Sequence, residues 1–162
     1  MPDDQSLSVL LLQNQEVILL SFKIFRKNCC GLDVHKTWIY ACIGITDANG
    51  RTDYKQTRFS SFSKGLKELS DWLAKYHCTE VCMESTDKYW IPVFNVLEKA
   101  DVSVILSHPK YTKPQKGNKT DRKDAKWICD LFMCDMVKHP EITDRYLAHT
   151  LRFKTLYSGR LS

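Results

Sequence analysis

Four carboxylates in three short motifs are the residues of this chain best suited to chemistry. Asp33 lies in Gly-Leu-Asp-Val-His-Lys, Glu84 in Cys-Met-Glu-Ser-Thr, and Asp121 and Asp124 in Lys-Thr-Asp-Arg-Lys-Asp-Ala. Each acid lies beside or within an apolar segment, where an uncompensated charge is costly to bury. The compensation that we expect is a pair of divalent metal ions of the kind that cleave nucleic-acid phosphodiesters.

Two predicted strands and one predicted helix must position these acids. The apolar residues Ile24, Phe25, Cys29, Cys30 and Leu32 predict a first strand that delivers Asp33 near its end. A short apolar run predicts a second strand that ends at Glu84. Apolar residues at helical spacing predict a helix over 125–136, and the three-residue spacing of Asp121 and Asp124 places both on one side of it. If the two strands are neighbours in one sheet, the four acids converge.

The remaining pattern predicts a mixed α/β sheet. Strands over 38–45 and 51–60, joined by an Asn-Gly turn, form an antiparallel meander with the first strand. Apolar spacing predicts a helix over 63–76 and a second helix that begins between 87 and 92, and a strand over 102–106 follows. Alternating strands and helices imply parallel crossovers, so we expect about five strands flanked by at least three helices.

The charge of the chain favours a polyanionic partner. The formal net charge is +5, and residues 1–22 contain three acids and no Lys or Arg, so the rest of the chain is more basic. Charge alone equally allows an ordinary solvated basic surface. We expect the loop over 110–119 to be exposed and to contact phosphates. The residues predicted to bind nucleic acid are Lys36, Lys88, Lys110, Lys113, Lys116, Lys119, Arg122 and Lys123.

Three ring-bearing residues next to the acid motifs have ordinary explanations as well as functional ones. His35 could hydrogen-bond a metal-bound water, but a surface histidine in a turn is the simpler interpretation. Tyr89 and Trp90 could stack on a base, but they fit better as packing residues at the start of a helix.

The seven cysteines are odd in number, follow no secretory signal and form no Cys-x-x-Cys pair. They therefore predict buried reduced thiols in a cytoplasmic protein rather than disulfides or zinc ligands. No segment reaches the roughly 20 apolar residues needed to span a bilayer, so we expect a soluble protein without membrane contact.

The three acid motifs, in this order, resemble those of the amino-terminal RuvC-like domain of the DEDD transposases of bacterial insertion sequences. The resemblance implies a ribonuclease-H-like fold over residues 23–149, with residues 1–22 as an appendage. It also implies that the four acids bind Mg²⁺ or Mn²⁺, as two ions. Asp87 stands where the family usually has glycine, and because Asp tolerates unusual turn dihedrals we expect an adjusted turn there.

The resemblance further implies DNA strand cleavage and exchange, with a guide RNA as a second nucleic-acid partner and a homo-oligomer as the full-length form. Family members continue through a helical segment into a domain that bears a catalytic serine. Residues 150–162 resemble only the start of that segment, so we expect this chain to need the serine domain. Two alternatives stay open: an inactive remnant that only binds nucleic acid or dimerises, and a self-sufficient RuvC-like nuclease.

Overall fold

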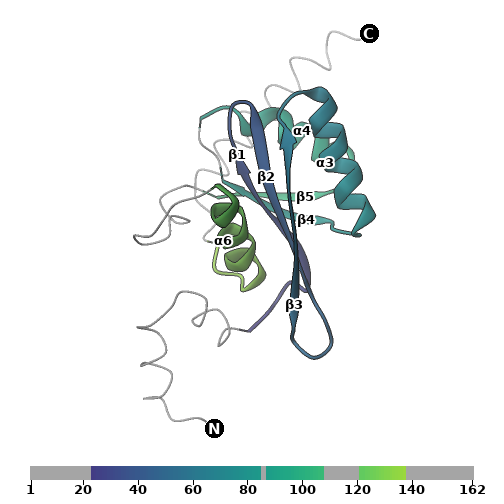
Figure 1. The fold of residues 1–162 in the computed structure, drawn as a ribbon, viewed down its shortest axis with the longest axis vertical. Helices are drawn as coiled ribbons and strands as arrows, with labels where there is room; N and C mark the ends of the chain where they lie inside the picture. The colour runs from purple at the N-terminus through teal and green to yellow at the C-terminus, as the bar shows by residue number, and fades with distance from the viewer. Residues whose placement is uncertain (1–22, 85–86, 108–120, 138–162) are drawn as a thin grey trace.

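The structure is a computed structural model that describes residues 23–84, 87–107 and 121–137 (Figure 1). Side chains of residues 121 and 122 are outside this description. The predicted loop over 110–119 and the predicted terminal segments, 1–22 and 150–162, also lie outside the described residues.

A five-stranded mixed sheet forms the centre of the fold. Its strands lie in the order β3-β2-β1-β4-β5. The pairs β3–β2 and β2–β1 are antiparallel, and the pairs β1–β4 and β4–β5 are parallel. The prediction of an antiparallel meander followed by parallel strands is therefore confirmed. The strands are β1 (Asn28–Val34), β2 (Trp38–Thr46), β3 (Thr52–Ser60), β4 (Glu80–Glu84) and β5 (Ser103–Ser107).

In the described part of the chain, three helices cover the two faces of the sheet. The helices α3 (Ser63–Lys75) and α4 (Trp90–Lys99) lie on one face, and α6 (Asp121–Met133) lies on the other (Figure 1). Side chains alternate between the faces along each strand. In β1, Leu32 therefore faces the α3 and α4 side, whereas Cys29 faces α6.

Two predicted boundaries are wrong. The first strand begins at Asn28, because the amides of Phe25 and Arg26 donate to the Met133 carbonyl at the end of α6 rather than to a strand. The helix predicted to reach Met136 ends at Met133, where Asp135 adopts a left-handed φ of 56°. This C-terminal turn satisfies the last helical carbonyls and leaves Met136 exposed.

All seven cysteines are buried free thiols, as predicted. Burial raises the pKa of Cys78 to about 11 and that of Cys82 to about 12, so these two thiols are neutral at pH 7. Among the described residues, no helix is long and apolar enough to cross a bilayer.

Candidate metal and nucleic-acid site

Asp33 and Glu84 lie side by side on neighbouring parallel strands. Their Cα atoms are register partners in the β1–β4 pair, and Glu84 is in turn the register partner of Ser107 on β5. Register partners point to the same face, and the alternation along β1 and β4 assigns this face to α6. The sequence prediction that both acids emerge at one region of one sheet is therefore confirmed.

The contacts between β1 and α6 move toward the start of the helix as β1 advances. Arg26 donates to the Phe132 carbonyl at 3.0 Å, and the Cys29 thiol lies 3.9 Å from the Cys129 carbonyl. A Cβ built on Gly31 would lie 2.4 Å from the Ala125 carbonyl oxygen. Asp33 follows Gly31 by two residues on β1. This progression therefore indicates that the first turn of α6 lies near Asp33.

That first turn contains the other two predicted acids. Asp124 is buried at 7% exposure, and Asp33 is buried at 8%. Asp121 begins α6, but its side chain is outside the described residues. Within 23–84, 87–107 and 121–137, no group of three or more His, Cys, Asp or Glu side chains is gathered tightly enough to hold a metal ion. Convergence of all four acids therefore stays a prediction.

His35 is a partner of Asp33 rather than a free surface residue of the turn. Its Nε2 lies 3.0 Å from Asp33 Oδ2, and donation from this nitrogen orients the carboxylate. The simpler interpretation of His35 was therefore incomplete.

Ser107 is a further candidate for the site, and sequence reasoning did not single it out. Its side chain is 1% exposed, and in the part of the chain that the structure describes its Oγ is buried without a hydrogen-bond partner. Because it is the register partner of Glu84, this unsatisfied hydroxyl lies at the edge of the carboxylate pair. The sequence signal for Ser107 was its position as the polar residue directly after the strand predicted over 102–106.

The predicted phosphate-binding residues are distributed unevenly. Lys36, Lys88 and Lys123 are exposed, in the β1–β2 turn, before α4 and on α6 respectively. Arg122 lies in α6, but its side chain is not described. Four predicted residues of the loop lie outside the described part: Lys110, Lys113, Lys116 and Lys119.

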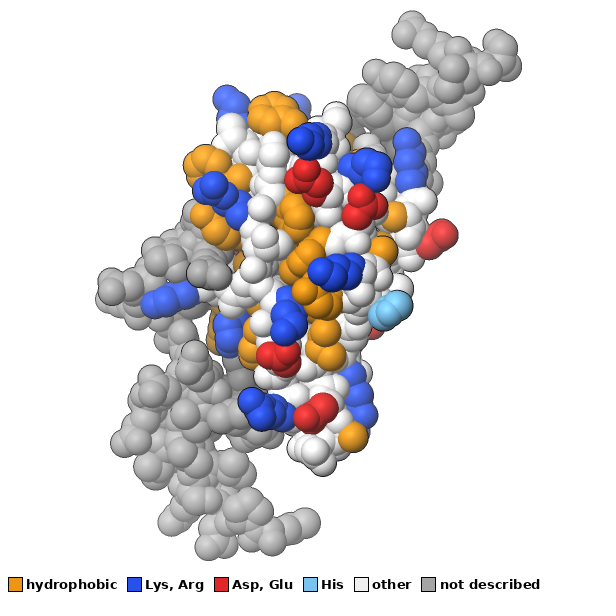
Figure 2. Space-filling model, turned by 45° about the vertical axis from the view of Figure 1, so that its right-hand side comes forward, with side chains coloured by type: hydrophobic (Ala, Val, Ile, Leu, Met, Phe, Trp, Pro, Cys, Tyr) orange, Lys and Arg blue, Asp and Glu red, His pale blue; other side chains and the backbone are white. Residues whose placement is uncertain are grey.

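Surface charge does not mark a single basic patch on the side of the molecule where α3 lies. Lys and Arg side chains there are interspersed with Asp and Glu side chains (Figure 2). Among them, Lys67 and Asp71 of α3 form an ion pair with N and O 2.9 Å apart. This side therefore presents mixed charge rather than a continuous basic surface for a polyanion.

The turn before α4 has the adjusted geometry expected for Asp87. Its φ is +57°, in the left-handed region that glycine adopts most easily and that Asp tolerates. Trp90 is buried and packs edge-on against Phe94, which confirms its interpretation as a packing residue, whereas Tyr89 is 37% exposed.

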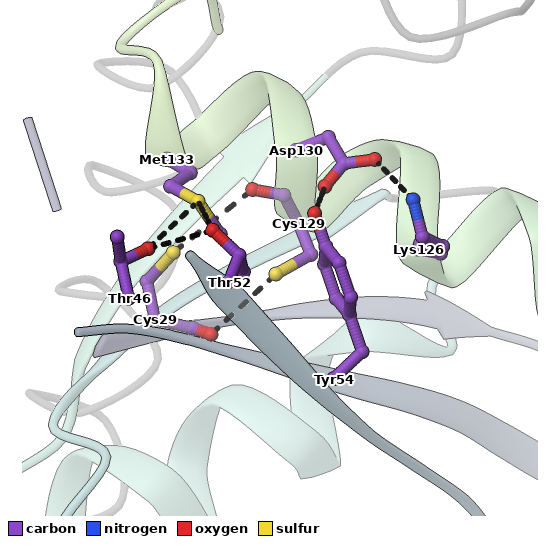
Figure 3. A network of polar contacts seen from close by, with 8 residues as sticks. All are labelled: Cys29, Thr46, Thr52, Tyr54, Lys126, Cys129, Asp130 and Met133. Atoms are coloured by element: carbon purple, nitrogen blue, oxygen red, sulfur yellow. Dashed lines mark hydrogen bonds and ion pairs between the residues drawn. The ribbon is translucent and has the colours of Figure 1, made fainter. Parts of the chain in front are cut away.

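A third buried acid, Asp130 of α6, belongs to a network separate from Asp33 and Asp124 (Figure 3). Asp130 accepts hydrogen bonds from the Tyr54 hydroxyl at 2.5 Å and from Lys126 Nζ at 2.9 Å. Burial, and then the bond to Asp130, raise the pKa of Tyr54, so its hydroxyl remains a donor. The i,i+4 spacing of Lys126 and Asp130 was a sequence signal for this pair. The charge of Asp130 is compensated by Lys126 within the protein.

Comparison with solved structures shows the fold family. RuvC of Thermus thermophilus matches with a TM-score of 0.50 and 11% identity, over 68% of this chain and 98% of that one. The same organism's RuvC in complex with Holliday junction substrate matches with a TM-score of 0.51 and 10% identity, over 70% of this chain and 99% of that one. The fold is RuvC-like, of the ribonuclease-H type.

Sequence comparison adds the family. No curated protein matches the chain. The family model for DEDD transposases of the IS110 type, described as "Transposase", matches residues 30–160 of the 162. This match includes all three acid motifs and most of the chain, which therefore belongs to the IS110-type DEDD transposase family.

Proposed function

We propose that this chain supplies the four-carboxylate, divalent-metal half of a DNA transposase active site, for DNA strand cleavage and exchange. The observation that carries the proposal is the register pairing of Asp33 with Glu84 on the sheet face that α6 covers. Buried Asp124 lies in the first turn of that helix. Membership of a transposase family and the RuvC-like fold support a recombinase domain that acts on DNA.

The donor set suits a hard divalent cation. Asp33, Glu84, Asp121 and Asp124 offer only carboxylate oxygens, which Mg²⁺ and Mn²⁺ prefer. The buried, unpartnered Ser107 Oγ next to Glu84 also fits a site where a hydrated ion belongs, because an unsatisfied buried hydroxyl is rare without a missing water or ion. Two bound ions would activate the attacking oxygen and stabilise the leaving oxygen of the phosphodiester.

The chain's own residues prepare this site. His35 holds one oxygen of Asp33 through the 3.0 Å contact, which limits rotation of the carboxylate. Gly31 allows α6 to approach β1 closely, because any side chain there would meet the helix backbone. The exposed residues Lys36, Lys88 and Lys123 would contact DNA phosphates around the acids.

The remaining parts of the proposal come from the family resemblance. Strand exchange would require a catalytic serine on a further domain, and a guide RNA and a homo-oligomer of the full-length form would complete the assembly. We therefore expect this chain to bind metal and nucleic acid by itself. Mg²⁺-dependent DNA cleavage by this chain without a serine domain would instead support a self-sufficient nuclease.

Thermal unfolding with and without Mn²⁺ tests the metal site. A ligand that binds only the native state stabilises it by about 2.7 kcal/mol at a hundredfold excess over Kd. Asp124→Asn should remove most of this gain while leaving the metal-free protein at least as stable, because it removes one of several repelling charges. Asp130→Asn is the matched control, since Asp130 is equally buried on α6 and belongs to the separate network with Tyr54 and Lys126.

The control should lower the unfolding temperature in both conditions and keep the Mn²⁺-induced shift. Equal shifts in the wild type and Asp124→Asn would refute Asp124 as a ligand. Absence of a shift in all three proteins would support the inactive-remnant alternative.

A further inference from the structure

A line of contacts leads from the candidate metal ligands to an exposed aromatic ring. Asp33 is bonded to His35, and the His35 ring centroid lies 5.9 Å from that of Trp38. The guanidinium of Arg58 lies over the Trp38 ring, 6.0 Å from the ring centroid. A carboxylate, an imidazole, an indole and a guanidinium therefore follow one another at the end of the sheet where β1 ends.

The register of the sheet places this group on the same face as the acids. Tyr40 is the register partner of both Asp33 and Arg58, so all three point to the α6 face. Trp38 precedes Tyr40 by two residues on β2 and shares that face. The indole therefore lies one strand away from Asp33 and at the same end of the sheet.

The last two members of the line, Trp38 and Arg58, are accessible. Trp38 is 40% exposed, which is unusual for a large aromatic side chain, and Arg58 is exposed. None of the ion pairs recorded among the described residues involves Arg58. An indole can stack on a base, and a guanidinium that no acid engages can bind a phosphate. The pair therefore suits the two parts of a nucleotide.

The same surface continues along β3 into a hollow with further cations. Gln56 and Tyr54 follow Arg58 on the α6 face of β3 at two-residue intervals. Both line a hollow of about 670 Å³ that spans this edge of the sheet, with Lys123 and Lys126 of α6 on one side and Lys55, Trp72 and Tyr76 on the other. Polar, aromatic and cationic side chains therefore line this surface from the acid end of the sheet to the hollow.

We propose that Trp38 and Arg58 bind a single-stranded segment of nucleic acid next to the carboxylate site, with one base stacked on the indole and its phosphate held by the guanidinium. The strand then runs along β3 toward Lys123. Trp38 and Arg58 are binding residues that position the strand, and they take no part in bond breaking. This inference rests on the proposed function, since it supplies the strand on which the carboxylate site would act.

Binding of two matched probes by the full chain tests this assignment. One probe is an oligo(dT) strand of about 12 nucleotides, and the other is an abasic deoxyribose-phosphate strand of equal length. Stacking is worth about 5- to 150-fold in affinity per base, so the wild type should prefer the strand that carries bases. Trp38→Ala should lose that preference, and Trp38→Phe should restore much of it. Arg58→Ala should weaken both probes alike and reduce the salt slope by about one counterion.

Phe25→Ala is the matched control. Phe25 is 60% exposed and has Lys23 Nζ 5.4 Å from its ring centroid, but it lies at the opposite end of β1. This variant should bind both probes like the wild type. An oligo(U) strand of the same length, measured in parallel, distinguishes RNA from DNA as the preferred source of the strand.

Three outcomes decide the matter. Retained base preference in Trp38→Ala overturns the proposal, as does equal loss in Trp38→Ala and Phe25→Ala. A change in self-association of Trp38→Ala with unchanged oligonucleotide affinity also overturns it, and assigns the surface to contacts between copies. The Mn²⁺-induced shift in unfolding temperature, measured on Trp38→Ala, should equal that of the wild type. Its absence from the wild type would refute the proposed function separately.

Discussion

The two faces of the sheet are built from different kinds of residue. The face under α3 and α4 is packed mainly with branched and aromatic side chains, such as Leu32, Ile43 and Leu69. The face under α6 is packed with glycines, thiols and a short apolar stripe, and it also buries Asp33 and Asp124. A face that must bring a helix and carboxylates close to the strands cannot fill the same space with large side chains.

The two faces therefore contribute to different properties of the protein, the α3 and α4 face to folding stability and the α6 face to the placement of the acids. The α3 and α4 face supplies most of the large apolar side chains, and its contribution to folding depends on their volume. The α6 face sets how close Asp124 comes to Asp33, and its contribution depends on backbone approach and on polar satisfaction. Substitutions on the two faces should therefore change different measured quantities.

The largest expected effect on stability lies on the α3 and α4 face. Leu69 of α3 is fully buried, and Leu69→Ala should lower the free energy of unfolding by about 2–5 kcal/mol, because it removes apolar contacts and leaves a cavity. Urea denaturation measures this change. The Mn²⁺-induced stabilisation of the folded variant should match that of the wild type, and a reduced metal effect would mean that the two faces are not independent.

A smaller loss of stability, with a loss of metal binding, is expected at Gly31. A Cβ there would lie 2.4 Å from both the Ala125 carbonyl oxygen and the Cys129 amide nitrogen, and the helix backbone cannot yield without moving α6. Gly31→Ala should cost about 3 kcal/mol and weaken Mn²⁺ binding. Denaturation with and without Mn²⁺ measures both effects.

Gly44→Ala is the matched control on the same face. Its added Cβ would chiefly meet the terminal methyl of Met133, which can rotate away. We expect a change of less than about 1.5 kcal/mol and normal Mn²⁺ binding. Equal effects of the two substitutions would contradict the claim that backbone approach at Gly31 positions the site.

The fold could be predicted well because its signals are local. Apolar alternation, the Asn-Gly turn and the helical spacing after Ser63 each depend on neighbouring residues, and all three correspond to elements of the structure. The errors occurred where a distant partner decides the boundary. Phe25 leaves the strand pattern because its amide bonds to Met133, and no local signal indicates that contact.

The site could be predicted as a set of acids but not as a surface. The motifs identified Asp33 and Glu84, whose pairing follows once β1 and β4 are neighbours. Trp38 and Arg58 were missed because their proximity depends on the β2–β3 register, which the exact length of the turn determines. Ser107 was missed because its burial depends on the whole sheet and not on its own neighbours in sequence.

The smallest expected change in stability is at Ser107, and it tests the polar character of the α6 face most directly. Its Oγ is buried without a partner among the described residues, so Ser107→Ala removes an unsatisfied group. The metal-free protein should be unchanged or more stable by up to about 1 kcal/mol. If that hydroxyl serves a hydrated ion beside Glu84, the same variant should bind Mn²⁺ more weakly, by about tenfold or more.

Ser103→Ala provides the comparison, because Ser103 is exposed at the other end of β5 and should change neither quantity. Isothermal titration with Mn²⁺ and urea denaturation of both variants measure the two quantities. Loss of stability in metal-free Ser107→Ala would show that the hydroxyl has a partner within the protein. Unchanged Mn²⁺ affinity of Ser107→Ala would show that the hydroxyl takes no part in metal binding. Asp33 and Glu84 would then be the only functional members of the row that they form with Ser107. A gain in stability of the metal-free protein together with a loss of Mn²⁺ affinity is, in contrast, the result expected if Ser107 binds a hydrated ion. Its unsatisfied hydroxyl lowers stability in the metal-free protein and gains a partner only when the ion binds.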